Sequence, residues 1–276
     1  MRNFFDTITY LLEDARKSLE WLRGSNYDCQ EELDEMENIL SSKQDWRESM
    51  KEMSQRHFLL PILMMLVIMT IQPYCGITML AVYSLDLFKR TEVQYNNYVL
   101  AIMATSLCTT GYLISTYLTK KVPRKVHFMT SGCVLACNLF IAGMIIKLKE
   151  TSPEDETIHW LSQNVFPICI VLSGLCYGLG VGPVPFALLG EVLPQKIKAV
   201  ASSTILTLRY TSIFMNLKFF PECATNFGVP TVLWFYCSVC LLISLIAYFI
   251  MPETRGKTLT ELSVLFEKKA PKEQAK

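Results

Sequence analysis

The sequence predicts an all-α membrane protein, in which a bundle of six transmembrane helices follows short cytosolic amphipathic helices. The 276 residues are 51% hydrophobic and 18% charged, which is too apolar for an ordinary soluble domain of this length. Charged residues gather at the two ends of the chain and in the joints between six apolar runs, so the net charge of +1 hides a strong segregation. Each run is long enough to span a bilayer, because about 20 apolar residues suffice.

The apolar runs set the expected boundaries of the helices, because a chain in hydrocarbon must satisfy its own backbone amides. A cytosolic helical linker region is expected over residues 1–56, a transmembrane bundle over 57–252 and a cytosolic tail over 253–276. The expected spans are 58–85, 97–119, 126–146, 165–189, 199–220 and 230–251. Pro252 ends the last span, since proline cannot continue the helix.

The linker region is expected to form two short helices that do not cross the membrane. Ala15, Leu19 and Leu22 fall on one face of the first helix. A second helix begins near Asp28, with acidic residues in its first turn, where the helix dipole favours them. Neither helix is apolar enough to span a bilayer.

Basic residues in the joints predict that both termini lie in the cytosol, because short loops rich in Lys and Arg stay on the cytosolic side. The basic joints carry Lys120, Lys121, Arg124 and Lys125 between the second and third spans, and Lys196 and Lys198 between the fourth and fifth. The opposite joints are poorer in basic residues, and the longest of them contains an acidic run, 154–156. The expected location is therefore the cell membrane, in a multi-pass arrangement.

The motifs do not favour catalysis. His57, His127 and His159 are scattered, and no nucleophile, metal cluster or phosphate-binding loop is apparent. Most cysteines lie within apolar runs, where they are expected to act as small packing residues. The sequence therefore predicts no enzyme, no cofactor, no metal site and no contact with nucleic acid.

Two segments outside the spans resemble a known family. Pro252 to Leu259 reads P-E-T-R-G-K-T-L, and it looks like the element that closes the last helix of sugar porters in the major facilitator superfamily. Ala15 to Leu33 resembles the cytosolic linker between the two halves of insect facilitated trehalose transporter-like proteins. The resemblance implies that the six spans are the C-terminal half of a twelve-helix fold.

Within the spans, the same resemblance implies a sugar site. The segment from Gln72 to Thr78 is similar to a Q-Q-x-x-G-I-N stretch whose amides contact sugar hydroxyls, and Thr78 replaces its Asn. Phe186 stands where an aromatic residue closes the cavity of the family, after a similar G-P-x-P segment. Arg209 and Tyr210 stand where the family has Asn and Trp. The implied substrate-binding residues are Gln72, Thr78, Phe186, Arg209 and Tyr210.

Two of these residues have alternative interpretations. A carboxamide both donates and accepts, which suits a sugar diol, but Gln72 could equally make a polar contact between helices. Arg209 lies in mid-span, where a charge costs about 2.5 to 3.5 kcal/mol on insertion scales and marks a partner or a watery cavity. Arg209 could donate to sugar hydroxyls, or it could mark a site under no constraint in a chain that no longer transports.

A cytosolic gate is implied as well. Glu191, in a segment that resembles an E-x-x-P-x-x-x-R element ending at Lys198, can pair with Arg124 or Lys125 across the gap between helices. The gate residues implied by the resemblance are Arg124, Lys125, Glu191, Lys198, Glu253 and Arg255. For the basic joint, the alternative is a topology signal without any gate.

The resemblance implies facilitative transport of a hexose or a trehalose-like disaccharide by alternating access. The chain would act as the C-terminal half of a longer porter, or together with a partner half or a second copy of itself. The alternative is a truncated, non-transporting paralogue that associates with or regulates a full-length porter.

Overall fold

The computed structural model describes residues 14, 16–19, 21, 30, 34, 56–93, 95–193 and 195–251, and of residues 56–58, 120, 195 and 196 only the backbone. Contacts divide the chain into two units, residues 1–52 and 53–276. In the first unit the described residues are helical, and the Ser18 hydroxyl donates to the Asp14 carbonyl at 2.8 Å. The rest of the expected linker helices and the segment Pro252 to Leu259 lie outside the described residues.

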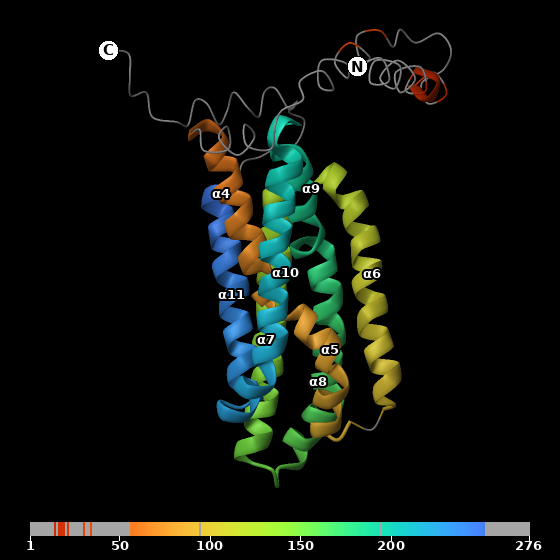
Figure 1. Cartoon of the computed structure of the whole chain (residues 1–276). Coiled ribbons are helices and arrows are strands. Elements are labelled where there is room, and N and C mark those ends of the chain that lie inside the picture. Colours follow the sequence, from red (N-terminus) through yellow and green to blue (C-terminus); the bar gives the residue numbers. More distant parts are fainter. Residues whose placement is uncertain are drawn as a thin grey trace. The chain divides into compact units, whose positions relative to one another are not determined.

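The second unit is a bundle of long helices, with no strand among its described residues (Figure 1). Several helices are joined end to end through a short irregular turn. In chain order the elements are α4 (Arg56–Ile71), the 3-10 turn η1 (Gln72–Cys75), α5 (Ile77–Arg90), α6 (Asn97–Lys121), α7 (Arg124–Thr151), α8 (Glu156–Cys176), the π turn η2 (Tyr177–Val181), α9 (Pro183–Val192), α10 (Gln195–Asn226) and α11 (Val229–Ile250).

Length and composition identify the helices that can cross a membrane. Within the described residues, five stretches are long and apolar enough: Leu59–Arg90, Asn97–Thr119, Arg124–Thr151, Glu156–Val192 and Val229–Ile250. The expected span 199–220 lies within α10, which is 32 residues long. Arg209 and the many hydroxyl side chains of α10 lower its mean hydropathy, so this helix is not among the five.

Local sequence explains where several helices begin. The Asn96 side chain accepts a hydrogen bond from the Tyr98 amide, and the Asp155 side chain accepts one from the Thr157 amide, so both residues act as N-caps of α6 and α8. Helix α11 follows Gly228, whose φ of 82° few other residues adopt. Proline at the first positions of α9 and α11 fits these helix starts, where no backbone donor is needed.

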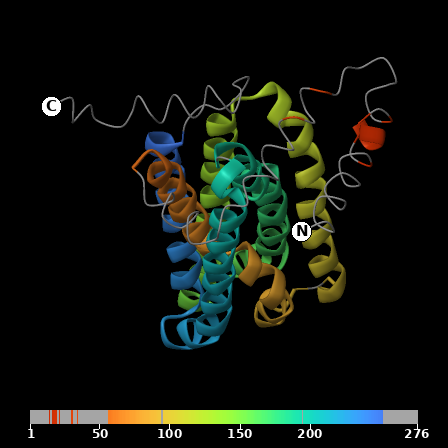
Figure 2. The ribbon, with the colours of Figure 1, turned by 45° about the horizontal axis from the view of Figure 1, so that its top comes forward.

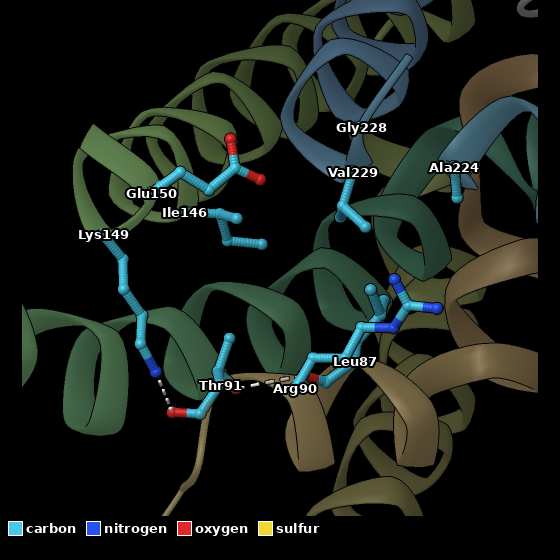
Figure 3. A pocket seen from close by; sticks show the side chains of 9 residues that line it. All are labelled: Leu87, Arg90, Thr91, Ile146, Lys149, Glu150, Ala224, Gly228 and Val229. Carbon is cyan, nitrogen blue, oxygen red and sulfur yellow. Dashed lines mark hydrogen bonds between the residues drawn. The ribbon is translucent and has the colours of Figure 1, made fainter. Parts of the chain in front are cut away.

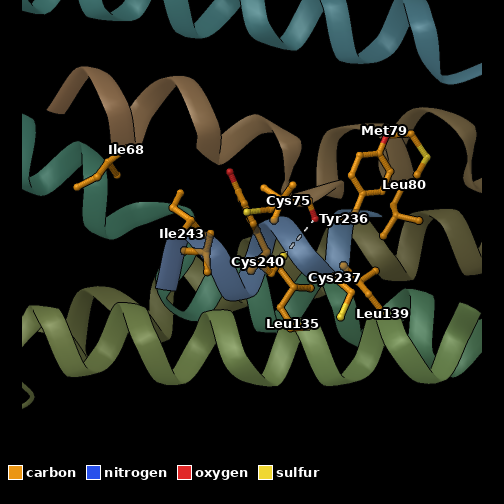
Figure 4. Packing of buried hydrophobic residues seen from close by; sticks show 14 of the residues in the cluster. Ile68, Cys75, Met79, Leu80, Leu135, Leu139, Tyr236, Cys237, Cys240 and Ile243 are labelled. Carbon is orange, nitrogen blue, oxygen red and sulfur yellow. Dashed lines mark hydrogen bonds between the residues drawn. The ribbon is translucent and has the colours of Figure 1, made fainter. Parts of the chain in front are cut away.

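The core lies where α7 packs against α11 and α8, and where α4 packs against α10. Figure 4 shows buried side chains of this core, with Ile68 on α4, Leu135 on α7 and Ile243 on α11. Cys75 and Cys240 are buried among them as free thiols, as expected for small packing residues. Lipid tails are as apolar as these side chains, so close packing rather than exclusion of water holds the helices together.

Helix α6 stands at the edge of the bundle in both Figure 1 and Figure 2. Only 11% of its most apolar stretch is buried, against 67% for the continuous α8–α9 span. Large apolar side chains such as Ile102 and Leu113 are exposed on it. The surface of α6 therefore suits a surrounding of lipid or further helices.

The helix ends gather at two opposite ends of the bundle. At one end, the start of α7 lies near the end of α9 and the start of α10. At the other end, the Lys149 ammonium donates to the Thr91 carbonyl at 3.1 Å (Figure 3), and it also lies 3.7 Å from the Glu92 carboxylate. These bonds border a cavity of about 320 Å³ between the ends of α5 and α7 and the start of α11.

Candidate functional site

Two of the long helices are interrupted near their middles, and the interruptions face each other. The first lies between α4 and α5, where Gly76 adopts φ 86° and ψ −9°. A β-carbon at Gly76 would lie 2.7 Å from the Tyr236 ring, so both the backbone angle and the close approach require glycine. The second interruption is the π turn η2, closed by the Gly182 amide donating to the Tyr177 carbonyl at 2.9 Å.

Prolines explain why the second interruption needs help from other helices. Pro183 and Pro185 lack backbone N–H groups, so the carbonyls of Leu179 and Val181 have no donor four residues ahead. A bare carbonyl in the membrane interior costs several kcal/mol. Other groups must therefore supply these hydrogen bonds.

Side chains from η1 and α7 supply them. The Gln72 Nε2 atom donates to the Val181 carbonyl at 2.7 Å. The His127 ring interacts with the Leu179 backbone, and its Nε2 lies 3.1 Å from the Ser115 hydroxyl. Ser131, also on α7, donates to the Cys176 carbonyl at 2.6 Å and accepts from the Val181 amide at 3.1 Å. The π turn is thus held by a polar network in addition to its own backbone bond from Gly182 to Tyr177.

Gln72 links the two interruptions directly. Besides Val181, its Nε2 donates to the Tyr177 hydroxyl at 2.9 Å, with a long contact to the Gly182 carbonyl at 3.4 Å. The side chain is fully buried. Its Oε1 atom has no hydrogen-bond partner among the described residues. Gln72 therefore makes the contact between helices, and one acceptor remains for another group.

Arg209 lies beside this network. It is only 8% exposed, and its guanidinium carbon lies 5.0 Å from the centre of the Phe186 ring. Its side chain also lies close enough to interact with the Tyr177 hydroxyl and, through its charge, with Tyr112. The Nε and Nη1 atoms are buried without a partner in the described part of the chain.

The other predicted substrate residues take different positions. Phe186 is 40% exposed and covers Arg209 from the surface of the bundle. Tyr210, the next residue along α10, is 63% exposed and points away from the buried network. Thr78, near the start of α5, is half-buried. The structure thus brings Gln72, Phe186 and Arg209 together around Tyr177, and it places the other two residues outside this group.

The first interruption has a network of its own. The Asn216 Nδ2 atom donates to the Pro73 carbonyl at 2.9 Å, and its Oδ1 accepts from the Tyr236 hydroxyl at 2.7 Å. The Cys240 thiol lies 3.7 Å from the Cys75 carbonyl. An aromatic-lined cavity of about 570 Å³ opens beside these residues, between α10 and α11.

At the end of the bundle where α7 begins, Arg124 and Glu191 form an ion pair between α7 and α9. Lys125, the other expected partner of Glu191, lies over the Tyr248 ring at 4.5 Å instead. Lys198 donates to the Gly190 carbonyl at 2.6 Å, which closes the end of α9. Glu253 and Arg255 lie outside the described residues.

Several residues of these networks were not singled out from the sequence: Tyr112, Ser115, Ser131, Tyr177, Asn216 and Tyr236. A signal was available for part of them. The pair Pro183 and Pro185 identifies two carbonyls that need donors from elsewhere, although it does not identify the donors. Among the described residues, no group of three or more His, Cys, Asp and Glu side chains could hold a metal ion.

Comparison with known sequences points to one family. The family model "Sugar (and other) transporter" matches residues 6–266. The facilitated trehalose transporter Tret1 of Drosophila yakuba is 27% identical over 252 residues, which are 91% of this chain and 29% of the relative. Tret1 of Bombyx mori is 27% identical over 254 residues, 92% of this chain and 50% of the relative. The chain therefore spans half or less of the length of these curated relatives.

Solved structures show the same fold. The major facilitator superfamily proton:xylose symporter XylE, bound to 6-bromo-6-deoxy-D-glucose, matches 92% of this chain and 52% of its own, with a TM-score of 0.71 at 19% identity. The inward open conformation of the xylose transporter XylE from E. coli matches 92% of this chain and 49% of its own, with a TM-score of 0.65 at 18% identity. The prediction of an all-α major facilitator fold is confirmed, and five helices in the described residues are long and apolar enough to cross a membrane.

Proposed function

Because the chain belongs to the sugar (and other) transporter family, we propose that it forms half of a facilitative sugar transporter, which moves a hexose or a trehalose-like disaccharide by alternating access. In this proposal residues 57–252 are the membrane bundle of a multi-pass protein of the cell membrane. The linker region 1–56 and the tail 253–276 both lie in the cytosol.

The observation that carries the proposal is the meeting of two interrupted helices at a buried polar network. Non-helical backbone at membrane depth is tolerated where it is buried in protein or lines a cavity, and transporters build their substrate sites from such discontinuous helices. Gln72, Phe186 and Arg209 provide an acceptor, an aromatic face and a donor beside η2. Thr78 and Tyr210 extend this wall of the site.

In this proposal, the ion pair between α7 and α9 acts as a gate at the cytosolic end of the bundle. Arg124 and Glu191 hold α7 and α9 together, and separating them opens a path between these helices. Lys125 and Lys198 stabilise the same end through Tyr248 and Gly190. Glu253 and Arg255 belong to this gate in the proposal.

A second half completes the pathway. The relatives are longer than the matched region, by about twofold for Bombyx mori. Phe186 and Tyr210 are exposed and would form one wall of the sugar site. The opposite wall of the site then comes from another segment, a partner half or a second copy of the chain.

Uptake of labelled glucose and trehalose by cells that express this chain tests the proposal. We expect uptake above that of cells with an empty vector, with saturation and competition by the unlabelled sugar. Glu191→Gln removes the gate charge, so we expect altered uptake at an unchanged amount of protein in the membrane. Background uptake by a chain that reaches the membrane would contradict transport by this chain alone or with a second copy of itself, and it would favour a non-transporting role.

A further inference from the structure

The charge of Arg209 has no counter-charge in the described bundle. An arginine stays protonated under all ordinary conditions. The described acids of residues 56–251 are Asp86, Glu92, Glu150, Glu154, Asp155, Glu156, Glu191 and Glu222. All of these acids lie toward the ends of the bundle, and no ion pair among the described residues contains Arg209.

The acids of the neighbouring helices lie too far away to pair with it. Glu191 is paired with Arg124. Glu222 lies on α10 itself but 13 residues further along, which is about 20 Å. Asp86 lines a small cavity together with Pro221 and Thr225, at the same distant end of α10.

What does surround Arg209 is aromatic and neutral. Phe186 covers the guanidinium at 5.0 Å, and the phenols of Tyr112 and Tyr177 lie near the Arg209 side chain. A cation–π contact and neutral hydroxyls stabilise a cation only partly. Two guanidinium nitrogens, Nε and Nη1, are left buried without a partner. Each of them can donate a charge-assisted hydrogen bond to a carboxylate oxygen.

A second unused group, a hydrogen-bond acceptor, belongs to Gln72, which also contacts Tyr177. Tyr177 accepts a hydrogen bond from Gln72 Nε2 at 2.9 Å and interacts with Arg209. The Oε1 atom of Gln72 is buried without a partner. One wall of the site thus presents an unsatisfied cationic donor and an unsatisfied neutral acceptor, bridged by a single phenol.

We propose that the substrate class of this site is a sugar acid, a polyhydroxylated monocarboxylate such as a hexuronate. This inference rests on the proposed transport function, and it adds a substrate class that the site should bind more tightly than neutral sugars. The carboxylate binds the Arg209 guanidinium and displaces the Phe186 ring, while a hydroxyl of the sugar donates to Gln72 Oε1. A neutral sugar leaves the buried charge uncompensated, which is unfavourable in a site of low dielectric.

Equilibrium binding to the full chain, purified and reconstituted in lipid nanodiscs, tests this proposal. The ligands are labelled D-glucuronate and labelled D-glucose, each displaced by unlabelled glucuronate or by D-glucuronamide, its neutral analogue of similar shape. We expect glucuronate to bind about tenfold more tightly than glucuronamide, because charge-assisted hydrogen bonds are roughly twice as strong as neutral ones.

Three variants assign the effect to the residue. Arg209→Gln should abolish the preference for the anion, and Arg209→Lys should retain part of it, because lysine keeps the charge but not the planar fork. Lys218→Gln is the matched control, since Lys218 is also a cation on α10 but lies at the rings of Phe214 and Phe219. It should leave the preference unchanged. Size-exclusion profiles and circular dichroism verify that each variant folds.

The outcomes separate the two proposals. Equal displacement by glucuronate and glucuronamide, or a preference that persists in Arg209→Gln, overturns the sugar-acid proposal. Binding of glucose without binding of glucuronate also overturns it, and it leaves sugar transport standing. A folded chain that binds neither labelled ligand contradicts the transport function together with the inference that rests on it.

Discussion

Replacing Gln72 with leucine removes the carboxamide that joins the two interrupted helices and keeps a side chain of similar size. In the native protein Gln72 is fully buried, and its Nε2 donates to the Val181 carbonyl at 2.7 Å and the Tyr177 hydroxyl at 2.9 Å. Leucine offers no donor, and Pro185 cannot supply the missing bond from within the helix. We therefore expect Gln72→Leu to destabilise the bundle at its middle.

The expected loss follows from these two bonds. A side-chain hydrogen bond between membrane helices contributes about 0.6 kcal/mol on average and up to about 1.7 kcal/mol. The Val181 carbonyl, left unsatisfied, adds a penalty of about 1 to 3 kcal/mol. The contact to the Gly182 carbonyl, at 3.4 Å, is too long to contribute much. The free energy of unfolding should therefore fall by about 2 to 4 kcal/mol.

Titration of the purified chain with sodium dodecyl sulfate in mixed micelles, followed by circular dichroism, measures this change. Thr105→Val is the matched control, because the Thr105 hydroxyl bonds only to the Ala101 carbonyl of its own helix, at 3.0 Å, on an exposed face. The control should change stability by less than about 0.5 kcal/mol. If Gln72→Leu is as stable as Thr105→Val, the carboxamide does not stabilise the interruptions and the reasoning is refuted.

Three further changes test other parts of the structure by the same titration. Arg124→Glu alone should destabilise the chain, and adding Glu191→Arg should restore about 0.2 to 1 kcal/mol, a modest value because both side chains are partly exposed. Gly76→Ala should cost about 1 to 3 kcal/mol, since its φ is 86° and the added carbon meets the Tyr236 ring, whereas Gly190→Ala has open space and should be neutral or slightly stabilising. Tyr236→Phe removes the hydrogen bond of 2.7 Å from the Tyr236 hydroxyl to the Asn216 side chain on α10, and it should cost about 0.5 to 1.5 kcal/mol.

Each of these changes has an outcome that would contradict its basis. A charge-swapped pair no more stable than Arg124→Glu would mean that the two side chains do not interact favourably. Equal stability of Gly76→Ala and Gly190→Ala would mean that the left-handed turn is not required. A Tyr236→Phe variant as stable as the native chain would assign the packing there to the ring alone.

The fold class and the family were predictable from the sequence, because both depend on features that are local in the chain. Apolar runs of membrane length predict helices, and short motifs indicate the family. The predicted fold and the predicted family are both confirmed. The helices extend beyond the apolar runs. Helix α7 runs from Arg124 to Thr151, although its apolar run covers only 126–146, because helical hydrogen bonding continues into polar residues at the membrane surface.

The site was less predictable, because it depends on which helices lie side by side. The sequence offered Arg124 and Lys125 as alternative partners of Glu191, and only the packing of α7 against α9 selects Arg124. The contact of Arg209 with Phe186 likewise joins α10 to α9 across a space that no spacing in the sequence encodes. The two prolines after η2 predict that two carbonyls need hydrogen-bond donors from other helices. The sequence does not predict which side chains provide these donors.

The π turn also gives α9 a mechanical property. Several of its backbone groups are bound by side chains of other helices, so the turn can bend by exchanging those partners, and few helical backbone bonds have to break. From Gly182 to Glu191 the helix is about 14 Å long, so a tilt of about 15° at the turn moves Glu191 by about 3.5 Å. That displacement is comparable to the reach of an ion pair. Helix α9 can therefore act as a lever that turns at η2, beside the proposed substrate residues, and moves Glu191, a residue of the proposed gate, at its other end.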